Sequence, residues 1–166
     1  MDSDRKLNWD INETLQTAKM VFGAIGDLVP IFQGFTDKGF YIIAMNIPDE
    51  LRGDFCDDVQ KFFSAFGVSR YTVSCLLHTN EKDYLTVTGV SKSDIKTTAF
   101  QITEENKLSE EAEEIGNLAG TLTQLLPYKY NPDNRRAAVE ALQQYGIDVE
   151  FHDKTGEATT LEIFGD

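Results

Sequence analysis

The chain has 166 residues, of which 41% are apolar and 26% charged, and its formal net charge is −13. This composition is typical of a folded globular protein and excludes a disordered chain; a chain of this length buries roughly 70% of its unfolded surface without disulfides. Because acidic residues outnumber basic ones by 28 to 15, we expect a surface that repels nucleic-acid phosphates and anionic membranes.

The N-terminal stretch "MDSDRKLNWD" lacks the apolar core of a signal peptide. The most apolar stretch, Met20–Phe32, is short and is interrupted by Asp27, so no transmembrane helix is expected. Two cysteines do not make a disulfide framework. These features together predict a cytoplasmic protein with reduced thiols.

The first third of the chain predicts a helix followed by a hairpin. Apolar side chains repeat at helical spacing over 11–25, with Asp10 as the expected N-cap. Two apolar stretches, 28–35 and 40–47, then flank Thr36-Asp37-Lys38-Gly39, which is typical of a β-hairpin. Pro30 should place the first of these strands at an edge of the sheet or delay its start.

A second helix is predicted after Pro48. Apolar residues form one continuous face between Asp49 and Gly67, and this face should cover a sheet. Its members are Leu51, Phe55, Val59, Phe62, Phe63 and Phe66. Three strands follow at 69–78, 83–91 and 96–103, rich in β-branched and aromatic residues and joined by short polar turns. They predict an antiparallel meander.

The last third predicts two more helices and two short strands. Apolar spacing over 108–126 indicates a helix, in which Gly116 and Gly120 form a small-residue stripe suited to close packing on a sheet or across a dimer. After Asn131-Pro132 a shorter helix is expected over 133–145. The segments "IDVEF" and "ATTLEIF" are strand-like.

The predicted fold is therefore α+β, a mainly antiparallel sheet with helices on one face. The helix over 50–66 joins two strands, so one parallel pair is allowed and the sheet can be mixed. We expect a single domain over 1–166, with a seam at 128–133 and residues 131–166 as a C-terminal α-β-β appendage.

Asp153-Lys154-Thr155-Gly156 matches the first four letters of the phosphorylation motif of P-type ATPases. Phosphoryl transfer there needs further carboxylates and a lysine downstream, and those motifs do not follow; Glu157 also replaces a threonine. Aspartate at the first position and glycine at the fourth are typical of a type I turn, and residues 36–39 repeat nearly the same letters. We therefore predict a turn, with no catalytic role for Asp153.

Metal binding is not predicted. Cys75 and His78 are three residues apart on an expected strand, which sends their side chains to opposite faces. Cys56 lies beside the apolar face of the second helix and is interpreted as a core residue. With no other pair at zinc-ligand spacing, no metal or cofactor is assigned.

Two further groups are candidates for chemistry. Asp54 and Asp58 share a helix face, which we interpret as a solvated flank. Cys75 with His152 is the one nucleophile–base pair that the sequence leaves open. No catalytic, cofactor-binding or metal-binding residue is assigned.

Residues 39–105, with a strand, a helix, "SRYTVSCLLHTN" and two more strands, resemble short uncharacterised α+β proteins of bacteria and their phages. In those proteins the strand after the helix commonly ends in Ser-Glu-Ala-Trp, whereas this chain has Ser74-Cys75-Leu76-Leu77. The resemblance implies the order of the elements and no activity.

The leading functional prediction is a non-catalytic protein–protein interaction module, which can be oligomeric. One alternative is a small hydrolase or transferase whose site is assembled from scattered polar residues. A second is an acidic inhibitor that competes for a nucleic-acid-binding partner, because acidic residues crowd at 49–58 and 104–114.

Overall fold

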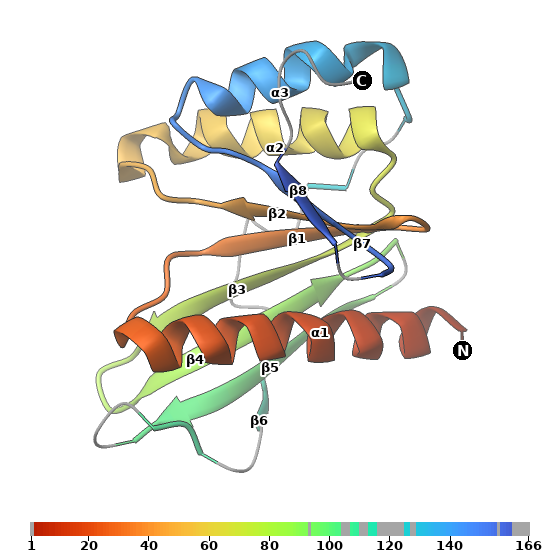
Figure 1. Ribbon diagram of the computed structural model, residues 1–166. Coiled ribbons are helices and arrows are strands. Elements are labelled where there is room, and N and C mark those ends of the chain that lie inside the picture. The colour runs from red at the N-terminus through yellow and green to blue at the C-terminus, as the bar shows by residue number, and fades with distance from the viewer. Residues whose placement is uncertain are drawn as a thin grey trace.

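The computed structural model describes residues 2–92, 94–103, 107–109, 113–115, 125–126, 129–155 and 157–160, and it confirms the α+β prediction (Figure 1). Within these residues three α-helices accompany one eight-stranded sheet of order β6-β5-β4-β3-β1-β2-β7-β8. The helices are α1 (Asp2–Ile25), α2 (Arg52–Phe66) and α3 (Arg135–Gln143). The strands are β1 (Ile31–Thr36), β2 (Gly39–Ala44), β3 (Arg70–His78), β4 (Asp83–Val90), β5 (Ile95–Ile102), β6 (Glu113–Ile115), β7 (Glu150–Asp153) and β8 (Ala158–Thr160). Within the described part of the chain, no helix has the length and apolar character needed to span a bilayer.

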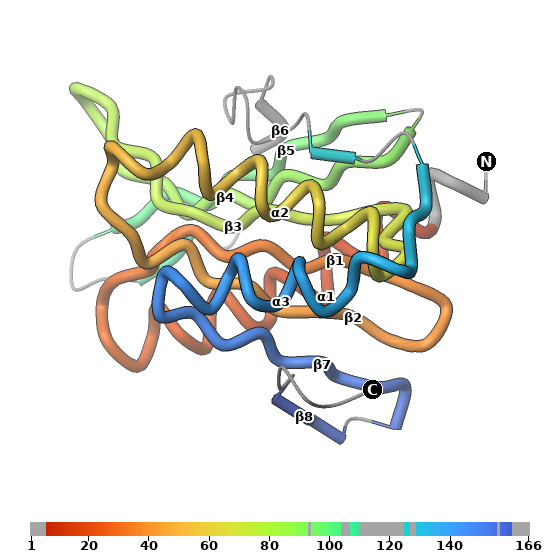
Figure 2. The backbone as a smooth tube through the Cα atoms, turned by 90° about the horizontal axis from the view of Figure 1, so that it is seen from above, coloured from red at the N-terminus to blue at the C-terminus, as the bar shows by residue number. Residues whose placement is uncertain are grey.

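Helices cover both faces of the sheet, so the prediction of helices on one face only was wrong. Figure 1 shows α2 and α3 above β1 and β2 and α1 below these strands, and in Figure 2, seen from above, α2 and α3 lie in front with α1 behind them. Four residues of the predicted apolar face, Phe55, Val59, Phe62 and Phe63, are buried and pack with Phe32, Tyr71 and Val73. Phe66 is partly buried, whereas Leu51 precedes α2 and is 37% exposed, so its place on the buried face was wrong. A second cluster unites α1 with the opposite face, where Leu7 and Ile11 lie with Leu85 and Val87.

The first helix begins at Asp2, nine residues earlier than predicted, and Asp10 is not its N-cap. The apolar stripe runs further back through Leu7, which is 1% exposed. Asp10 belongs to the same buried face, since it is 0% exposed and paired with Arg70. In the sequence Asp10 looked like the start of the helix, because the arginine that pairs with it in the buried interface lies 60 residues away.

All strand pairs between the described strands are antiparallel, so the parallel pair that the sequence allowed does not form among them. The connection through α2 carries the chain from β2 to β3, and β1 lies between them in the sheet. β1 begins directly after Pro30, at Ile31. Of the two predicted effects of Pro30, the late start of the strand is therefore confirmed, and the place at the edge of the sheet is not. The hairpin, the meander and the helix near 133–145 are confirmed.

The helix predicted over 108–126 was wrong where the structure describes that segment. Leu108 forms a bridge with Ile102, and Glu113–Ile115 is strand β6, paired with β5. Pairing with the edge of the sheet at β5 thus outweighs the helical pattern of this segment. The Gly116 and Gly120 stripe lies outside the described residues.

The C-terminal α-β-β unit joins the main sheet. β7 pairs with β2 and β8 pairs with β7, while α3 packs on α2. Gly39 makes the β2–β7 pairing possible, because its φ is +152° and a Cβ there would lie 2.1 Å from the His152 carbonyl oxygen. No side chain fits that gap without moving β7.

Gly39→Ala should therefore lower the free energy of unfolding by about 3 kcal/mol or more, through backbone strain and overpacking. The matched control is Gly23→Ala on α1, because a Cβ added at Gly23 would meet no neighbouring atom within 4 Å; this variant should be neutral or more stable by up to about 1 kcal/mol. Urea unfolding followed by circular dichroism measures both. Equal stability of the two variants would contradict the β2–β7 contact.

Candidate functional site

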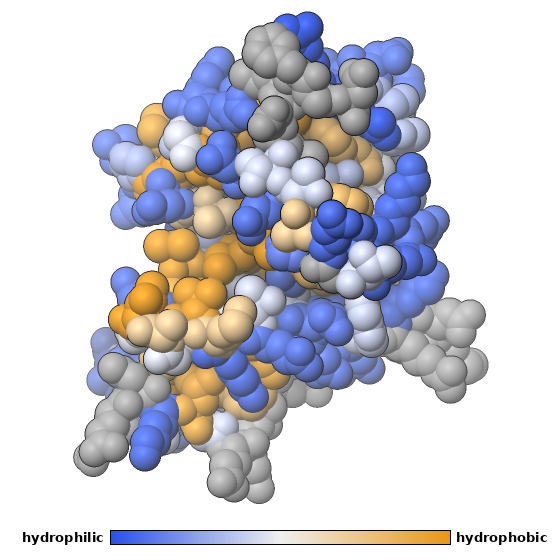
Figure 3. Space-filling view, viewed as in Figure 1, coloured by the Kyte–Doolittle hydropathy of each residue, from blue (hydrophilic) through white to orange (hydrophobic). Residues whose placement is uncertain are grey.

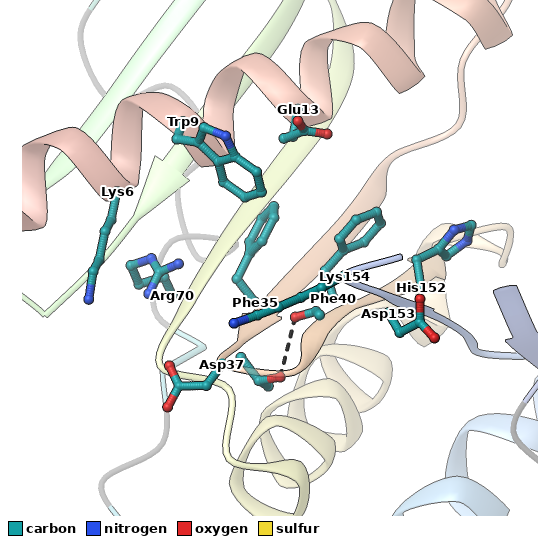
Figure 4. A pocket seen from close by; sticks show the side chains of 12 residues that line it. Lys6, Trp9, Glu13, Phe35, Asp37, Phe40, Arg70, His152, Asp153 and Lys154 are labelled. Carbon is teal, nitrogen blue, oxygen red and sulfur yellow. Dashed lines mark hydrogen bonds between the residues drawn. The ribbon is translucent and has the colours of Figure 1, made fainter. Parts of the chain in front are cut away.

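A groove of about 450 Å³ opens beside α1, on the half of the sheet that this helix leaves uncovered. α1 packs on β3 and β4 and, through Gln33 and Phe35, on β1, so the groove lies beside the helix toward β2 and β7 on the same face. The lining comes from α1, from the β1–β2 and β7–β8 turns and from the start of β3 (Figure 4). It comprises Lys6, Trp9, Glu13, Phe35, Thr36, Asp37, Gly39, Phe40, Arg70, His152, Asp153 and Lys154.

The floor of the groove is one row of directly paired residues across four strands. Arg70 on β3 pairs with Phe35 on β1, Phe35 pairs with Phe40 on β2, and Phe40 pairs with His152 on β7. Directly opposite residues in antiparallel strands point to the same face, so all four side chains face the α1 side. We call this set the floor row.

Aromatic rings follow one another along the floor row and up to α1. The Trp9 ring meets Phe35 edge to face at 6.2 Å, and Phe35 lies 5.6 Å from Phe40. Phe40 stacks on the imidazole of His152 at 5.0 Å with an interplanar angle of 3°. Phe35 is 2% exposed, whereas Trp9, the single tryptophan of the chain, is 54% exposed and offers its ring to a ligand.

Arg70 is held in place by Asp10 of α1. Its Nε donates to Asp10 Oδ2 at 2.7 Å and its Nη2 donates to Oδ1 at 3.2 Å. The Asp10 side chain is fully buried, while 18% of the Arg70 side chain is exposed at the groove. A guanidinium has five N–H donors, so three remain that bind no described residue.

Burial raises the pKa of Asp10 above its ordinary value of 3.8. The hydrogen bond and the positive charge of Arg70, and the charge of Lys6, act in the opposite direction and offset only part of this effect. Taking a carboxylate out of water is thus the larger contribution, even with a guanidinium beside it. The pair is a costly buried feature, which positions Arg70 rather than adding much stability.

Charges of both signs surround the rings. Lys6 and Lys154 form no ion pair with any described residue, and the same holds for Glu13 and Asp37. Figure 4 shows Lys6, Arg70 and the carboxylate of Asp37 toward one end of the groove, and Glu13 on α1 beyond Trp9, toward His152. The Arg70 end therefore carries charges of both signs, and Glu13 adds a negative charge beside the rings.

Asp153 lies in a turn, as predicted. Its Oδ1 accepts hydrogen bonds from the backbone N–H of Thr155 at 2.9 Å, the Thr155 hydroxyl at 2.6 Å and the backbone N–H of Glu157 at 3.0 Å. The backbone N–H of Asp153 in turn donates to the Glu157 carbonyl at 3.0 Å, which closes the β7–β8 connection. These bonds are those of an aspartate that shapes a turn.

The structure separates the remaining chemical candidates. Cys75 faces the α2 side, as do Tyr71 and Val73, and His152 faces the α1 side, so this pair does not converge. His78 is on the opposite face of β3 from Cys75, as the odd spacing predicts, and it pairs with Asp83 at 3.0 Å. Cys56 is 8% exposed in the core, and burial raises the pKa of its thiol. No cluster of three metal-ligating side chains occurs among the described residues.

On the acidic flank of α2, Asp54 is exposed as predicted, whereas Asp58 is partly buried. Asp58 accepts a hydrogen bond from the Tyr145 hydroxyl at 2.7 Å. Burial first, and then this bond and the charges of Asp58, Asp54 and Asp57, raise the pKa of Tyr145 to about 12. The flank thus helps to fix the end of α3. Most of the acidic stretch 104–114 lies outside the described residues, so the inhibitor hypothesis stays a prediction.

Comparisons with protein-family models, curated proteins and solved structures gave no match. The assignment of the groove as a candidate site therefore depends on its geometry alone. Sequence reasoning missed it because its lining comes from four distant segments. Two signals were available, namely the single tryptophan at position 9 and an arginine that opens a strand.

Asp153→Asn should keep the stability of the wild type, because an amide oxygen can accept the same turn bonds. Asp153→Ala should lower it by about 1–2 kcal/mol, since all three of those side-chain bonds are lost. Urea unfolding compares the two, and incubation with ATP and magnesium should leave no hydroxylamine-sensitive phosphate on the protein. Such a phosphate, absent from Asp153→Asn, would contradict the turn interpretation.

The Asp10 pair predicts a pH dependence. Since the folded-state pKa is raised, the folded protein binds more protons than the unfolded chain between pH 3.8 and that pKa, so stability from this group falls as pH rises. The Asp10→Asn variant lacks this titration. We subtract the unfolding free energy of this variant from that of the wild type at several pH values above 3.8. This difference should decrease as the pH rises toward the folded-state pKa of Asp10. A difference that increases would show that Arg70 outweighs burial.

Proposed function

We propose that this chain is a non-catalytic binding protein that acts through protein–protein contact and that the groove beside α1 is its contact surface. The observation that carries this proposal is the position of Trp9. Its ring, 54% exposed, leans over the floor row next to an arginine immobilised by a buried carboxylate.

The composition of the groove favours a protein partner. Tryptophan, other aromatic residues and arginine are enriched at the centres of protein interfaces, and a charged rim commonly surrounds them. Here Trp9, Phe40 and Arg70 form the centre, and charged side chains such as Lys154 and Glu13 stand around it. A large exposed ring loses little conformational entropy on binding, which makes Trp9 a suitable anchor.

The lining gives less support to the alternative of a hydrolase or transferase. An enzyme of this class that uses a hydroxyl nucleophile needs a base beside that hydroxyl. Thr36 is the one hydroxyl among the described lining residues, and it donates to the Gly39 carbonyl at 3.2 Å. The Nε2 atom of His152 is buried without a hydrogen-bond partner among the described residues, 3.6 Å from a Glu150 oxygen.

We further propose a cytoplasmic setting, where thiols stay reduced. Both cysteines are free, Cys56 buried and Cys75 half-buried. The partner can be another protein or a second copy of this chain.

The test compares proteins captured from a native lysate by three immobilised baits: wild type, Trp9→Ser and Met20→Ser. Met20 is the matched control because it is 70% exposed on the same helix but does not line the groove. Met20 and Ile25 are each 70% exposed near the C-terminal end of α1, where Figure 3 shows apolar surface. Loss of capture with Met20→Ser alone would assign the contact to that region instead.

A partner captured stoichiometrically by wild type and Met20→Ser should be lost with Trp9→Ser, since truncating a central aromatic anchor costs at least about 2 kcal/mol, or about 30-fold in affinity. Quantitative mass spectrometry reads the result, and circular dichroism confirms that both variants are folded. Capture that is unchanged by Trp9→Ser would contradict the proposal.

A further inference from the structure

The three remaining N–H donors of Arg70 bind no described residue and are available to a ligand at the exposed part of the side chain. Asp10 fixes the guanidinium through Nε and Nη2, so these donors keep one direction in the groove. Its exposed part lines the groove beside Phe35. A planar donor set held in this way matches a carboxylate, because guanidinium and carboxylate form parallel hydrogen bonds.

The charges around Arg70 select the sign of the ligand. Asp10 compensates the charge of Arg70, and Lys6 on the next turn of α1 adds a positive charge without an ion pair among the described residues. Lys154 extends across the groove from the β7–β8 turn (Figure 4). The carboxylate of Asp153 is engaged in its own turn. An acidic group at the Arg70 end thus meets the guanidinium donors and two ammonium groups, and Asp37 is the carboxylate at that end that opposes it.

The next part of the groove suits an aromatic ring. Phe40 and His152 present a flat stacked pair, and Trp9 stands above the floor row. A ligand ring can meet the edges of this pair and contact the exposed ring of Trp9, which adds attraction beyond its buried area. Glu13 lies toward this end, so a second acidic group there is disfavoured.

The dimensions fit a short extended segment. Lys6 and Glu13 are seven residues apart on α1, which corresponds to about 10 Å. Three residues of an extended chain cover about the same length, and side chains two residues apart point to the same side, about 7 Å from each other. One such segment can place a carboxylate at Arg70 and a ring between Trp9 and Phe40.

We propose that the groove binds an extended peptide segment of a protein partner in which an acidic residue stands two positions from an aromatic one. This inference rests on the proposed function and specifies its partner. Arg70 and Lys6 take the carboxylate, and Trp9, Phe40 and His152 take the ring. Because the whole chain carries −13, recognition depends on these local groups and not on the overall field.

The test uses blocked pentapeptides and the fluorescence of Trp9, which is the single tryptophan of the chain. The probe is acetyl-Gly-Glu-Gly-Phe-Gly-amide, and it is compared with peptides that carry Gln or Lys in place of Glu, or Leu in place of Phe. The Glu peptide should change the Trp9 emission saturably and bind at least about tenfold more tightly than the Gln peptide, the size of effect expected of a charge-assisted pair.

Two variants locate the contacts. In Arg70→Lys the preference for Glu over Gln should fall to about twofold or less, because a lysine cannot make the parallel pair. In Phe40→Leu the preference for Phe over Leu should fall in the same way while the preference for Glu persists. Phe40→Leu keeps the Asp10–Arg70 pair, so it tests the ring contact even if Arg70→Lys does not fold.

Equal binding of the Glu and Gln peptides, or tighter binding of the Lys peptide, would overturn the inference. So would 3-phenylpropionate binding as tightly as the Glu peptide, which would assign the groove to a small aromatic acid. If no peptide binds but a lysate partner still depends on Trp9, the proposed function stands and this inference falls. If the peptides bind as expected but Trp9→Ser captures the same lysate proteins as wild type, the ligand chemistry stands and the proposed function falls.

Discussion

The buried ion pair between Asp10 and Arg70 fixes the relation between the first helix and the sheet, and the groove depends on it. Apolar packing positions a helix on a sheet through the shapes of its side chains, and a buried ion pair adds contacts that depend on direction. A fully buried carboxylate with one guanidinium partner allows little freedom, since any shift leaves a charge unpaired away from water. The register of α1 is therefore set at Asp10, one residue from Trp9.

The hydroxyl contacts further along α1 reinforce this register. Thr14 donates to the Gln33 side-chain oxygen at 2.6 Å and lies 2.5 Å from the Thr72 hydroxyl oxygen, and all three residues are buried. Gly89 lets the helix approach closely, because a Cβ there would lie 2.8 Å from Leu7. Polar contacts and a missing side chain thus hold α1 against β3 and β4. The same placement leaves the floor row beyond Phe35 open.

The uncovered half of the sheet explains why a binding surface can exist on this face. α2 and α3 fill the opposite face of β1 and β2 with the phenylalanine-rich core, whereas α1 is a single helix and cannot cover eight strands. The apolar rings that remain there are kept in place by the strand register and not by a helix above them. Charged side chains at both ends confine this exposed apolar area to the groove, as expected of a specific contact surface.

Most of the fold could be predicted from the sequence, because its hairpin, its meander and α2 carry local signals of period 2 or 3.6. Prediction failed where a distant partner decides the outcome. Asp10 looked like a cap because Arg70 lies 60 residues away, and Glu113–Ile115 looked helical although it pairs with β5. The groove depends on strand order for the same reason, since only the order β3-β1-β2-β7 brings Arg70, Phe35, Phe40 and His152 into one row.

The turn at Asp153 shows the opposite case. Its letters match a catalytic motif, yet the turn chemistry of aspartate and the repeat of those letters at 36–39 already indicated a hairpin, and Gly39 in fact pairs with Asp153. For this segment the local preferences of aspartate and glycine for turns predicted the structure better than similarity to a catalytic motif did. No comparable local preference marks a site formed by four segments.

The central claim is that α1 holds Trp9 over Phe35 at the edge of an open aromatic row. Nuclear Overhauser effects between the Trp9 indole protons and the Phe35 ring, measured in the free protein, test it most directly. With ring centroids 6.2 Å apart in an edge-to-face arrangement, clear cross-peaks are predicted. Absence of these cross-peaks, with Trp9 in contact with other side chains instead, would contradict the placement of α1 and with it the groove.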